Sequence, residues 1–295
     1  MTDTPAKPGS PYDRVQDLLL LPPLPVVACK LLELVGHDNC EINALATLIE
    51  QDPGLAARIV GIANSAYFAR RTPIRSVTEA IVRVLGLNLV RGIAIGIALS
   101  KPFDASACPA FELERYWYRA FQTASLAAAL APLVQLDDTE QGSLFLCGLL
   151  HNLGQIVLVH AFPDRMHRVF KLWAEQPAPG LRSYQAQHIA MTEIEAGALI
   201  AKRWQLPSSV AEVIEFRHEP LHAGARAPLV QLIACCANYD SALYAEPETP
   251  VPPLNAFGAA LADVQAEVVE KVLQQLHATD EQTRALAQSI TSSSV

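Results

Sequence analysis

Apolar residues recur at intervals of three and four along most of the chain, which is the spacing of one face of an α-helix. We find no segment that alternates apolar and polar residues over the length of a strand, so the pattern predicts an all-α protein. The predicted helices cover residues 25–35, 42–51, 53–63, 77–85, 88–100, 112–130, 142–151, 155–160, 164–175, 193–204, 209–217, 229–243, 258–277 and 280–290.

Several helix boundaries follow from local sequence signals. Asp52-Pro53 ends one predicted helix and opens the next, because the residue before a proline avoids the α region. Gly86 is suited to close the helix that precedes it. Side chains expected to cap helix starts are Ser76 and Thr192, each followed by Glu three residues later, and Ser208.

The composition is that of a compact globular protein. Of the 295 residues, 51% are hydrophobic and 18% are charged, and the formal net charge is −8. An acidic chain has no broad attraction for nucleic acid or anionic lipid. The one dense basic cluster, Arg70-Arg71 with Arg75, is interpreted as a solvated loop. We therefore expect no nucleic-acid partner.

The cysteines and the apolar stretches indicate a cytoplasmic location. The six cysteines include no Cys-x-x-Cys pair, and Cys147 lies in an apolar helical run where a thiol acts as a small hydrophobe. The polar N-terminal residues do not have the pattern of a secretion signal. Residues 82–100 are apolar but are interrupted by Arg83, Asn88 and Arg91, so we expect no membrane span there.

Two motifs have a structural and a functional interpretation. The segment 64–68, Asn-Ser-Ala-Tyr-Phe, could recognise a ligand, but it more often forms a helix end in which Asn caps the backbone locally. The aromatic residues 116–118 are interpreted as packing at a seam between subdomains. The most informative motif is Gly-Leu-Leu-His-Asn-Leu-Gly at 148–154, which contains the dipeptide His151-Asn152.

An ordered series of segments resembles the HDOD domain over roughly residues 14 to 245. The segments are 21–25 (LPPLP), 48–53 (LIEQDP), 63–68 (ANSAYF), 74–87, Trp117, 148–154, 204–207 (WQLP) and His218. The resemblance implies a fold related to that of the HD phosphohydrolases, commonly without their metal ligands, and a regulatory role in bacterial signalling. It also implies an N-terminal helical subdomain, residues 14–103, packed on a degenerate HD-like helical bundle, residues 110–245. Residues 254–290 would form a C-terminal helical extension that packs on the body or mediates a homodimer.

The resemblance also implies which residues stand at the former metal-ligand positions. They are Arg119 in place of the first histidine, His151, Asn152 in place of the aspartate, Glu193, Arg217, His218 and, near the last position, Asn238. An arginine cannot donate a lone pair to a metal, and an amide offers one neutral oxygen where a carboxylate offers two charged ones. At ~4 Å and a dielectric near 20, one unit charge opposes another by about 4 kcal/mol. The pattern therefore disfavours a divalent ion, and we expect no cofactor and no catalytic residue.

We hypothesise that Arg119 replaces the metal by pairing with Glu193 and hydrogen-bonding Asn152. Two alternatives stay open. His151, Glu193 and His218 are a sufficient zinc set when water fills the fourth position, so a metal-dependent phosphohydrolase with a reduced ligand set is one. A module that binds a nucleotide or small anion on Arg119 and Arg217 is the other. The favoured function is a non-catalytic module that acts through protein partners of a bacterial signalling pathway, without membrane contact.

Overall fold

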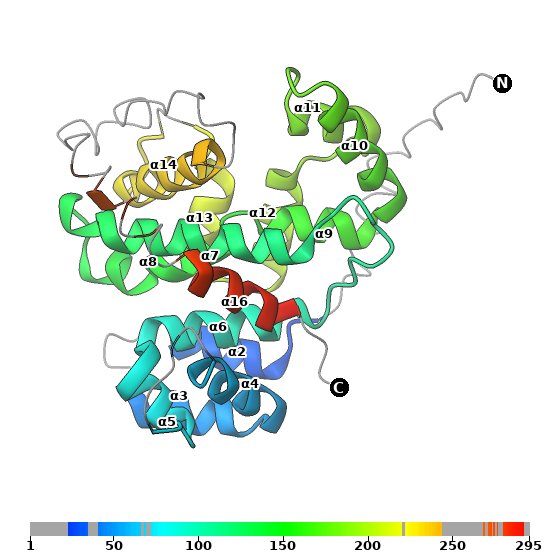
Figure 1. The fold of residues 1–295 in the computed structure, drawn as a ribbon. Helices are drawn as coiled ribbons and strands as arrows, with labels where there is room; N and C mark the ends of the chain where they lie inside the picture. Colours follow the sequence, from blue (N-terminus) through cyan, green and yellow to red (C-terminus); the bar gives the residue numbers. More distant parts are fainter. Residues whose placement is uncertain are drawn as a thin grey trace.

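The protein is a stack of helices in which the N-terminal and central parts lie one above the other (Figure 1). The computed structural model describes residues 23–34, 41–65, 68, 72–219, 222–243, 268, 271, 272, 274, 276 and 280–291. Within these residues there are helices and no strands, which confirms the predicted all-α class. The elements are α2 (Val26–Glu33), α3 (Ile42–Glu50), α4 (Pro53–Ala63), α5 (Val77–Ala80), the π-helix η2 (Ile81–Leu85), α6 (Leu87–Ser100), α7 (Leu113–Leu130), the 3-10 helix η3 (Ala131–Leu133), α8 (Asp138–Leu150), α9 (Leu153–Ala161), α10 (Pro163–Glu175), α11 (Leu181–His188), α12 (Glu193–Arg203), α13 (Ser208–Phe216), α14 (Ala227–Leu243) and α16 (Asp280–Thr291).

Local side-chain caps fix the N-terminal helices. The Asp52 side chain accepts a hydrogen bond from the backbone N–H of Leu55 at the start of α4. At the other end of α4, the Asn64 side chain donates to the carbonyl of Val60 and both donates to and accepts from the backbone of Ile74. The structural interpretation of Asn64 is confirmed, because its amide closes the helix and ties the following segment back to it.

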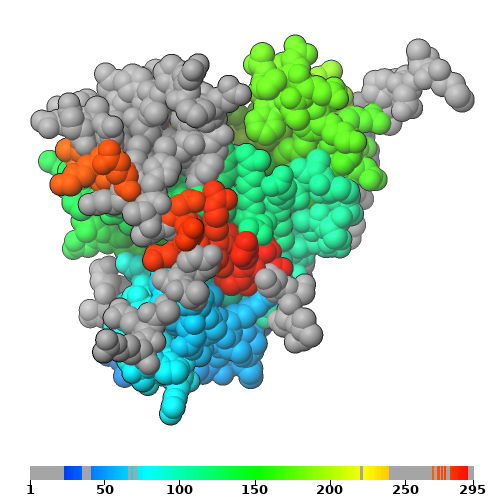
Figure 2. All heavy atoms as spheres, in the orientation of Figure 1, coloured from blue at the N-terminus to red at the C-terminus, as the bar shows by residue number. Residues whose placement is uncertain are grey.

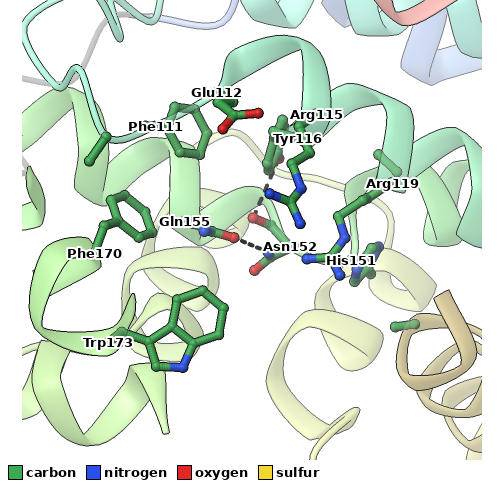
Figure 3. A pocket seen from close by; sticks show the side chains of 13 residues that line it. Phe111, Glu112, Arg115, Tyr116, Arg119, His151, Asn152, Gln155, Phe170 and Trp173 are labelled. Carbon is green, nitrogen blue, oxygen red and sulfur yellow. Dashed lines mark hydrogen bonds between the residues drawn. The ribbon is translucent and has the colours of Figure 1, made fainter. Parts of the chain in front are cut away.

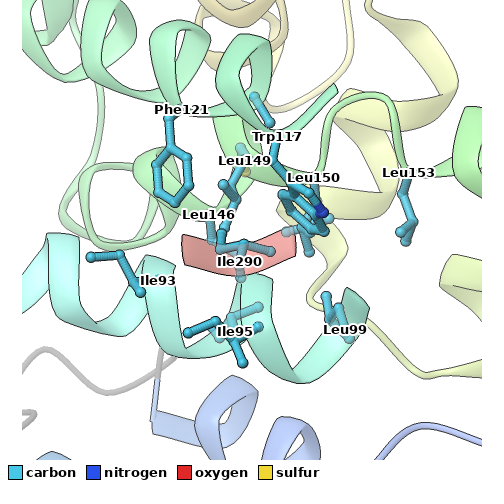
Figure 4. Close-up of a cluster of buried hydrophobic side chains, with 14 of the residues drawn as sticks. Ile93, Ile95, Leu99, Trp117, Phe121, Leu146, Leu149, Leu150, Leu153 and Ile290 are labelled. Atoms are coloured by element: carbon cyan, nitrogen blue, oxygen red, sulfur yellow. The ribbon is translucent and has the colours of Figure 1, made fainter. Parts of the chain in front are cut away.

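The main core lies where α6, α7 and α8 meet (Figure 4). Trp117 and Phe121 on α7 are fully buried together with Leu146, Leu149 and Leu150 on α8. Gly148 makes the tight approach of α7 and α8 possible, because a Cβ added to it would lie 2.5 Å from Cα of Ala124. The central helix pair is thus held by large apolar side chains around one point of backbone contact.

The last helix, α16, lies across the boundary between the N-terminal helices and the central ones (Figure 2). Its buried side chains are Thr283, Leu286, Ala287 and Ile290. A Cβ added to Gly96 of α6 would lie 2.9 Å from Cδ1 of Ile290 and 3.5 Å from the Trp117 ring. Trp117 therefore packs at the seam, as expected, and the predicted helix at 280–290 packs on the body of the same chain.

Several helix boundaries differ from the sequence-based expectation by a few residues, and one helix was not predicted. α8 begins at Asp138 instead of 142, because Asp137 and Glu140 form a reciprocal capping box. Ser208 does not cap α13; it is the first helical residue, and Pro207 precedes it without a side-chain cap. Helix α11 was not predicted, because its residues do not follow a clear apolar periodicity.

One described helical stretch is long and apolar enough to cross a bilayer. It runs from Asp138 to Ala161 through α8 and α9, and 72% of its most apolar window is buried inside the protein, as in the core helix of a globular domain. Helix α6, for which we expected no span, is shorter. The basic pair 70–71, Tyr67, and most of the predicted helix 258–277 lie outside the described residues.

Candidate functional site

The site is built around a two-residue break between α8 and α9. His151 is the C-terminal cap of α8, and Asn152 takes φ −113° and ψ 26° before α9 begins. His151 is 9% exposed, and its Nδ1 lies 2.7 Å from the carbonyl oxygen of Gly148. Because a carbonyl only accepts, Nδ1 carries the proton and the ring is fixed by its own helix.

The second glycine of the motif brings another helix to this break. A Cβ on Gly154 would lie 1.8 Å from the carbonyl oxygen of Glu193 and 2.6 Å from the backbone nitrogen of Gly197. Only glycine permits α9 and α12 to approach this closely. This contact places the first residue of α12, Glu193, beside the Asn152 end of α9.

Both side-chain polar atoms and the backbone oxygen of Asn152 are engaged. Its side-chain oxygen accepts a hydrogen bond of 3.2 Å from Nη2 of Arg217, and its side-chain nitrogen donates to Oε1 of Gln155. Its backbone oxygen accepts from the Tyr116 hydroxyl at 3.4 Å (Figure 3). The one neutral oxygen that the amide could offer a metal is therefore bound to a guanidinium.

Arg217 is the buried cation of the site. It caps the C-terminal end of α13, its side chain is 4% exposed, and its Nη1 donates to the carbonyl oxygen of Ile214 at 2.9 Å. Burial lowers the pKa of Arg217 to about 10, and the charge of Glu193 acts in the opposite direction. The guanidinium therefore stays charged at neutral pH, in the space between Asn152 and Glu193.

Glu193 is surrounded by cationic and imidazole groups. Its Oε1 lies 3.8 Å from Nε of Arg182, 3.9 Å from Nη2 of Arg217 and 3.8 Å from Nε2 of His218, while its Oε2 is buried without a hydrogen-bond partner. Burial raises the pKa of the Glu193 carboxyl, and Arg217 partly counters this. The backbone N–H of Glu193 donates to Oε1 of Gln185 at 3.0 Å.

The two histidines are held neutral. Burial first, then the charges of Arg217 and Arg119, lower the pKa of His151 to about 3. Burial and the charges of Arg217 and Arg182 lower the pKa of His218 to about 3 as well. Both rings lie close to the buried Arg217 guanidinium, and like charges disfavour the protonated form of a histidine.

The residues present do not fit the metal that the fold family implies. Among the described residues, no three His, Cys, Asp or Glu side chains gather closely enough to hold an ion. His151, Glu193 and His218, the reduced zinc set, are thus not arranged as ligands, and Arg217 puts a permanent positive charge among them.

The hypothesis of an Arg119–Glu193 ion pair is wrong. Among the described residues, the cations within 4 Å of Glu193 are Arg182 and Arg217, with the neutral ring of His218 beside them, and the cation that bonds Asn152 is Arg217. Arg119 projects from α7 toward His151 and lines a pocket with it (Figure 3). Asn238 has an exposed side chain that donates to the carbonyl of Ala234 on its own helix.

Sequence reasoning missed Arg182, Gln185, Tyr116 and Gln155 as members of the site. Arg182 and Gln185 lie on the unpredicted helix α11, and Gln185 is fully buried. No sequence pattern indicated that Gln185 is buried or that Arg182 reaches the site. Gln155 could have been found, because a polar side chain three residues after Asn152 lies within reach at a helix start.

The family model of the HDOD domain matches residues 21–220, about two thirds of the 295 residues. The chain therefore belongs to the HDOD family. An uncharacterized protein from Treponema pallidum (strain Nichols) is 29% identical over 240 residues, which cover 79% of this chain and 44% of that protein. The chain thus spans less than half the length of this curated relative.

Solved structures share the fold. One, described as a putative signal transduction protein from Marinobacter aquaeolei VT8, matches with a TM-score of 0.78 at 26% identity, over 95% of this chain and 62% of that chain. An HDOD domain protein with unknown function from Geobacter sulfurreducens matches with a TM-score of 0.71 at 20% identity, over 95% and 98%. A putative phosphohydrolase from Shewanella amazonensis SB2B matches with a TM-score of 0.70 at 22% identity, over 94% of this chain and 98% of that chain. The last two similarities are to the fold alone.

Proposed function

We propose that this HDOD protein is a non-catalytic regulatory module that acts in bacterial signal transduction through contacts with other proteins. The observation that carries the proposal is the buried Arg217 guanidinium, which bonds Asn152 and faces Glu193. The described relative from Marinobacter aquaeolei VT8, a putative signal transduction protein, supports the signalling context.

The chemistry of the site argues against hydrolysis. A metal-dependent phosphohydrolase needs ligands that stabilise a divalent ion and activate water. Here an arginine with a pKa of about 10 sits where such an ion would be repelled, and the Asn152 oxygen is already bound. Arg217 connects α9, α12 and α13, so we assign it the structural role that coordination would otherwise have.

A hydrolysis assay tests the non-catalytic part. The purified protein, supplied with Mn²⁺, Mg²⁺, Fe²⁺ or Zn²⁺ in turn, is incubated with bis(p-nitrophenyl) phosphate beside a His151→Ala variant. We expect both proteins to release nitrophenol at the same background rate. Metal-dependent release that disappears in His151→Ala would instead establish the reduced-ligand phosphohydrolase.

Site-specific photo-crosslinking in the native host tests the protein contacts. Exposed apolar side chains are the natural positions for the probe: Val26 is 70% exposed, Val82 63% and Leu199 41%. We expect defined protein adducts from at least one of these positions and none from Arg168, an exposed polar control on α10. The absence of adducts at every apolar position would contradict the proposal.

We place the protein in the cytoplasm. Cys108, Cys147, Cys235 and Cys236 are buried free thiols, which suits a reducing compartment. The net charge of −8 supports protein partners over nucleic acid or a membrane surface. Fractionation of host cells is the corresponding measurement, with recovery in the soluble fraction as the expected result.

A further inference from the structure

A pocket of about 200 Å³ opens beside the site, between the start of α7, the α8–α9 break and α10 (Figure 3). It does not include Arg217, which is buried behind Asn152. The pocket is therefore separate from the ion-pair cluster, and its two walls differ in chemistry.

One wall is aromatic. Phe111 and Phe170 stack with ring centroids 5.8 Å apart and an interplanar angle of 22°, and Tyr116 adjoins Phe111 at 5.7 Å. Trp173 on α10 lines the same side and is 36% exposed, although tryptophan is usually well buried. This wall is a preassembled surface on which a planar ring can stack.

The opposite wall is cationic. Arg115 and Arg119 are four residues apart on α7, so they lie on one helix face, and both side chains reach into the pocket (Figure 3). Arg115 is exposed and forms no hydrogen bond or ion pair with another described residue. Glu112 also lines the pocket, which leaves Arg115 as the candidate partner for an anion.

The size restricts the ligand. Pockets for drug-sized molecules typically enclose roughly 300–1,000 Å³. A pocket of about 200 Å³ suits one ring system, not a dinucleotide. We infer that this pocket binds a small molecule with one planar aromatic ring and one anionic group, the ring on Phe111, Phe170 and Trp173 and the anion on Arg115. The inference does not depend on the non-catalytic function proposed above.

Ligand-observed NMR with the full chain tests the inference. Phenyl phosphate and benzoate are the probes, one for each type of anion. Phenol and inorganic phosphate are the separate halves of phenyl phosphate, and phenol and formate represent the ring and the carboxylate of benzoate. We expect at least one probe to bind with a Kd in the high micromolar to millimolar range, roughly tenfold more tightly than either half. The tighter of the two probes then identifies the preferred anion.

Two variants assign the binding to this pocket. We expect Arg115→Gln and Trp173→Ala each to weaken binding about 3- to 10-fold, because one removes the cation and the other a stacking face. Arg168→Gln, an exposed arginine of α10 outside the pocket lining, should leave the affinity unchanged. Circular dichroism verifies that each variant is folded. If Trp173→Ala does not fold, the binding measurement on Arg115→Gln alone tests the assignment to this pocket.

Three results would overturn the inference: no binding of either probe, binding that neither variant weakens, or inorganic phosphate binding as tightly as phenyl phosphate. Release of phenol from phenyl phosphate is a separate outcome. It would contradict the non-catalytic function while leaving the binding site intact, so the two proposals fail independently.

Discussion

Nη2 of Arg217 donates a hydrogen bond of 3.2 Å to the side-chain oxygen of Asn152, across 65 residues of sequence. The same nitrogen lies 3.9 Å from the Glu193 carboxylate. One buried guanidinium thus links three helices among the residues that the sequence resemblance assigns to former metal-ligand positions. Removal of the Arg217 side chain leaves the buried Glu193 carboxylate with less positive charge around it.

Replacing Arg217 with methionine should destabilise the protein by about 3–5 kcal/mol, the usual cost of removing one partner of a buried charge pair. Urea unfolding measures the change. The double variant Arg217→Met/Glu193→Gln should cost less than the sum of its single changes, because it leaves neither charge buried. Arg182→Gln is the control: its side chain is 46% exposed, so its loss should cost under about 1 kcal/mol. Additive single and double effects would show that Arg217 and Glu193 do not interact.

Two glycine-to-alanine substitutions separate the cost of a clash between two helices from the gain in helix propensity. Gly154→Ala should cost about 3 kcal/mol or more, because its Cβ would lie 1.8 Å from the Glu193 carbonyl oxygen and α9 must move away from α12. Gly61→Ala in α4, where no atom lies within 4 Å of the added Cβ, should be neutral or stabilise by up to ~1 kcal/mol. Equal effects of the two substitutions on the free energy of unfolding would refute the close approach.

Much of the fold follows from local sequence. The Asp52-Pro53 boundary and the Thr192–Glu195 capping box were predicted correctly, because each depends on atoms a few residues apart. The close approach at Gly154 was not predicted, since it depends on which distant helix lies opposite.

The site was predicted less completely for the same reason. His151, Asn152, Glu193, Arg217 and His218 do lie near one another. The hypothesis that Arg119 pairs with Glu193 was wrong, because residue type alone does not say which arginine faces the carboxylate. Helix α11, with Arg182, was missed because no apolar periodicity marks it.

The two neutral histidines predict a loss of stability in mild acid. Each has a pKa of about 3 when folded and about 6.5 when unfolded, so below pH 6.5 the unfolded chain binds more protons and the free energy of unfolding falls. The contribution approaches about 1.4 kcal/mol per histidine per pH unit. Glu193, whose pKa is raised, has the opposite pH dependence. Its contribution to the free energy of unfolding is present below its ordinary pKa and is lost as the pH rises through the raised pKa.

The pH dependence of the free energy of unfolding, compared between variants, isolates the contribution of the two histidines. Between pH 6 and pH 5, the free energy of unfolding of His218→Asn should fall less steeply than that of the unmodified protein, by up to about 1.4 kcal/mol per pH unit. The double variant with His151→Asn should be flatter still. Parallel slopes for the three proteins would show that these histidines are protonated in the folded state.

The C-terminal helix should contribute to global stability. Ile290 is 2% exposed and fills the seam beside Gly96 and Trp117, so Ile290→Ala should cost about 2–4 kcal/mol in thermal or urea unfolding. Leu199→Ala, at a position that is 41% exposed, is the matched control and should change stability by under about 1 kcal/mol. If Ile290→Ala behaved like this control, α16 would be an independent appendage.

The metal content of the purified protein tests whether Arg217 replaces a divalent ion. The protein is prepared without chelator, incubated with Mn²⁺, Fe²⁺ or Zn²⁺, dialysed and analysed by inductively coupled plasma mass spectrometry. We expect below about 0.1 equivalents of any of these metals per chain, because a preformed ligand set is missing. Retention of one equivalent per chain, lost in His151→Ala, would contradict the account.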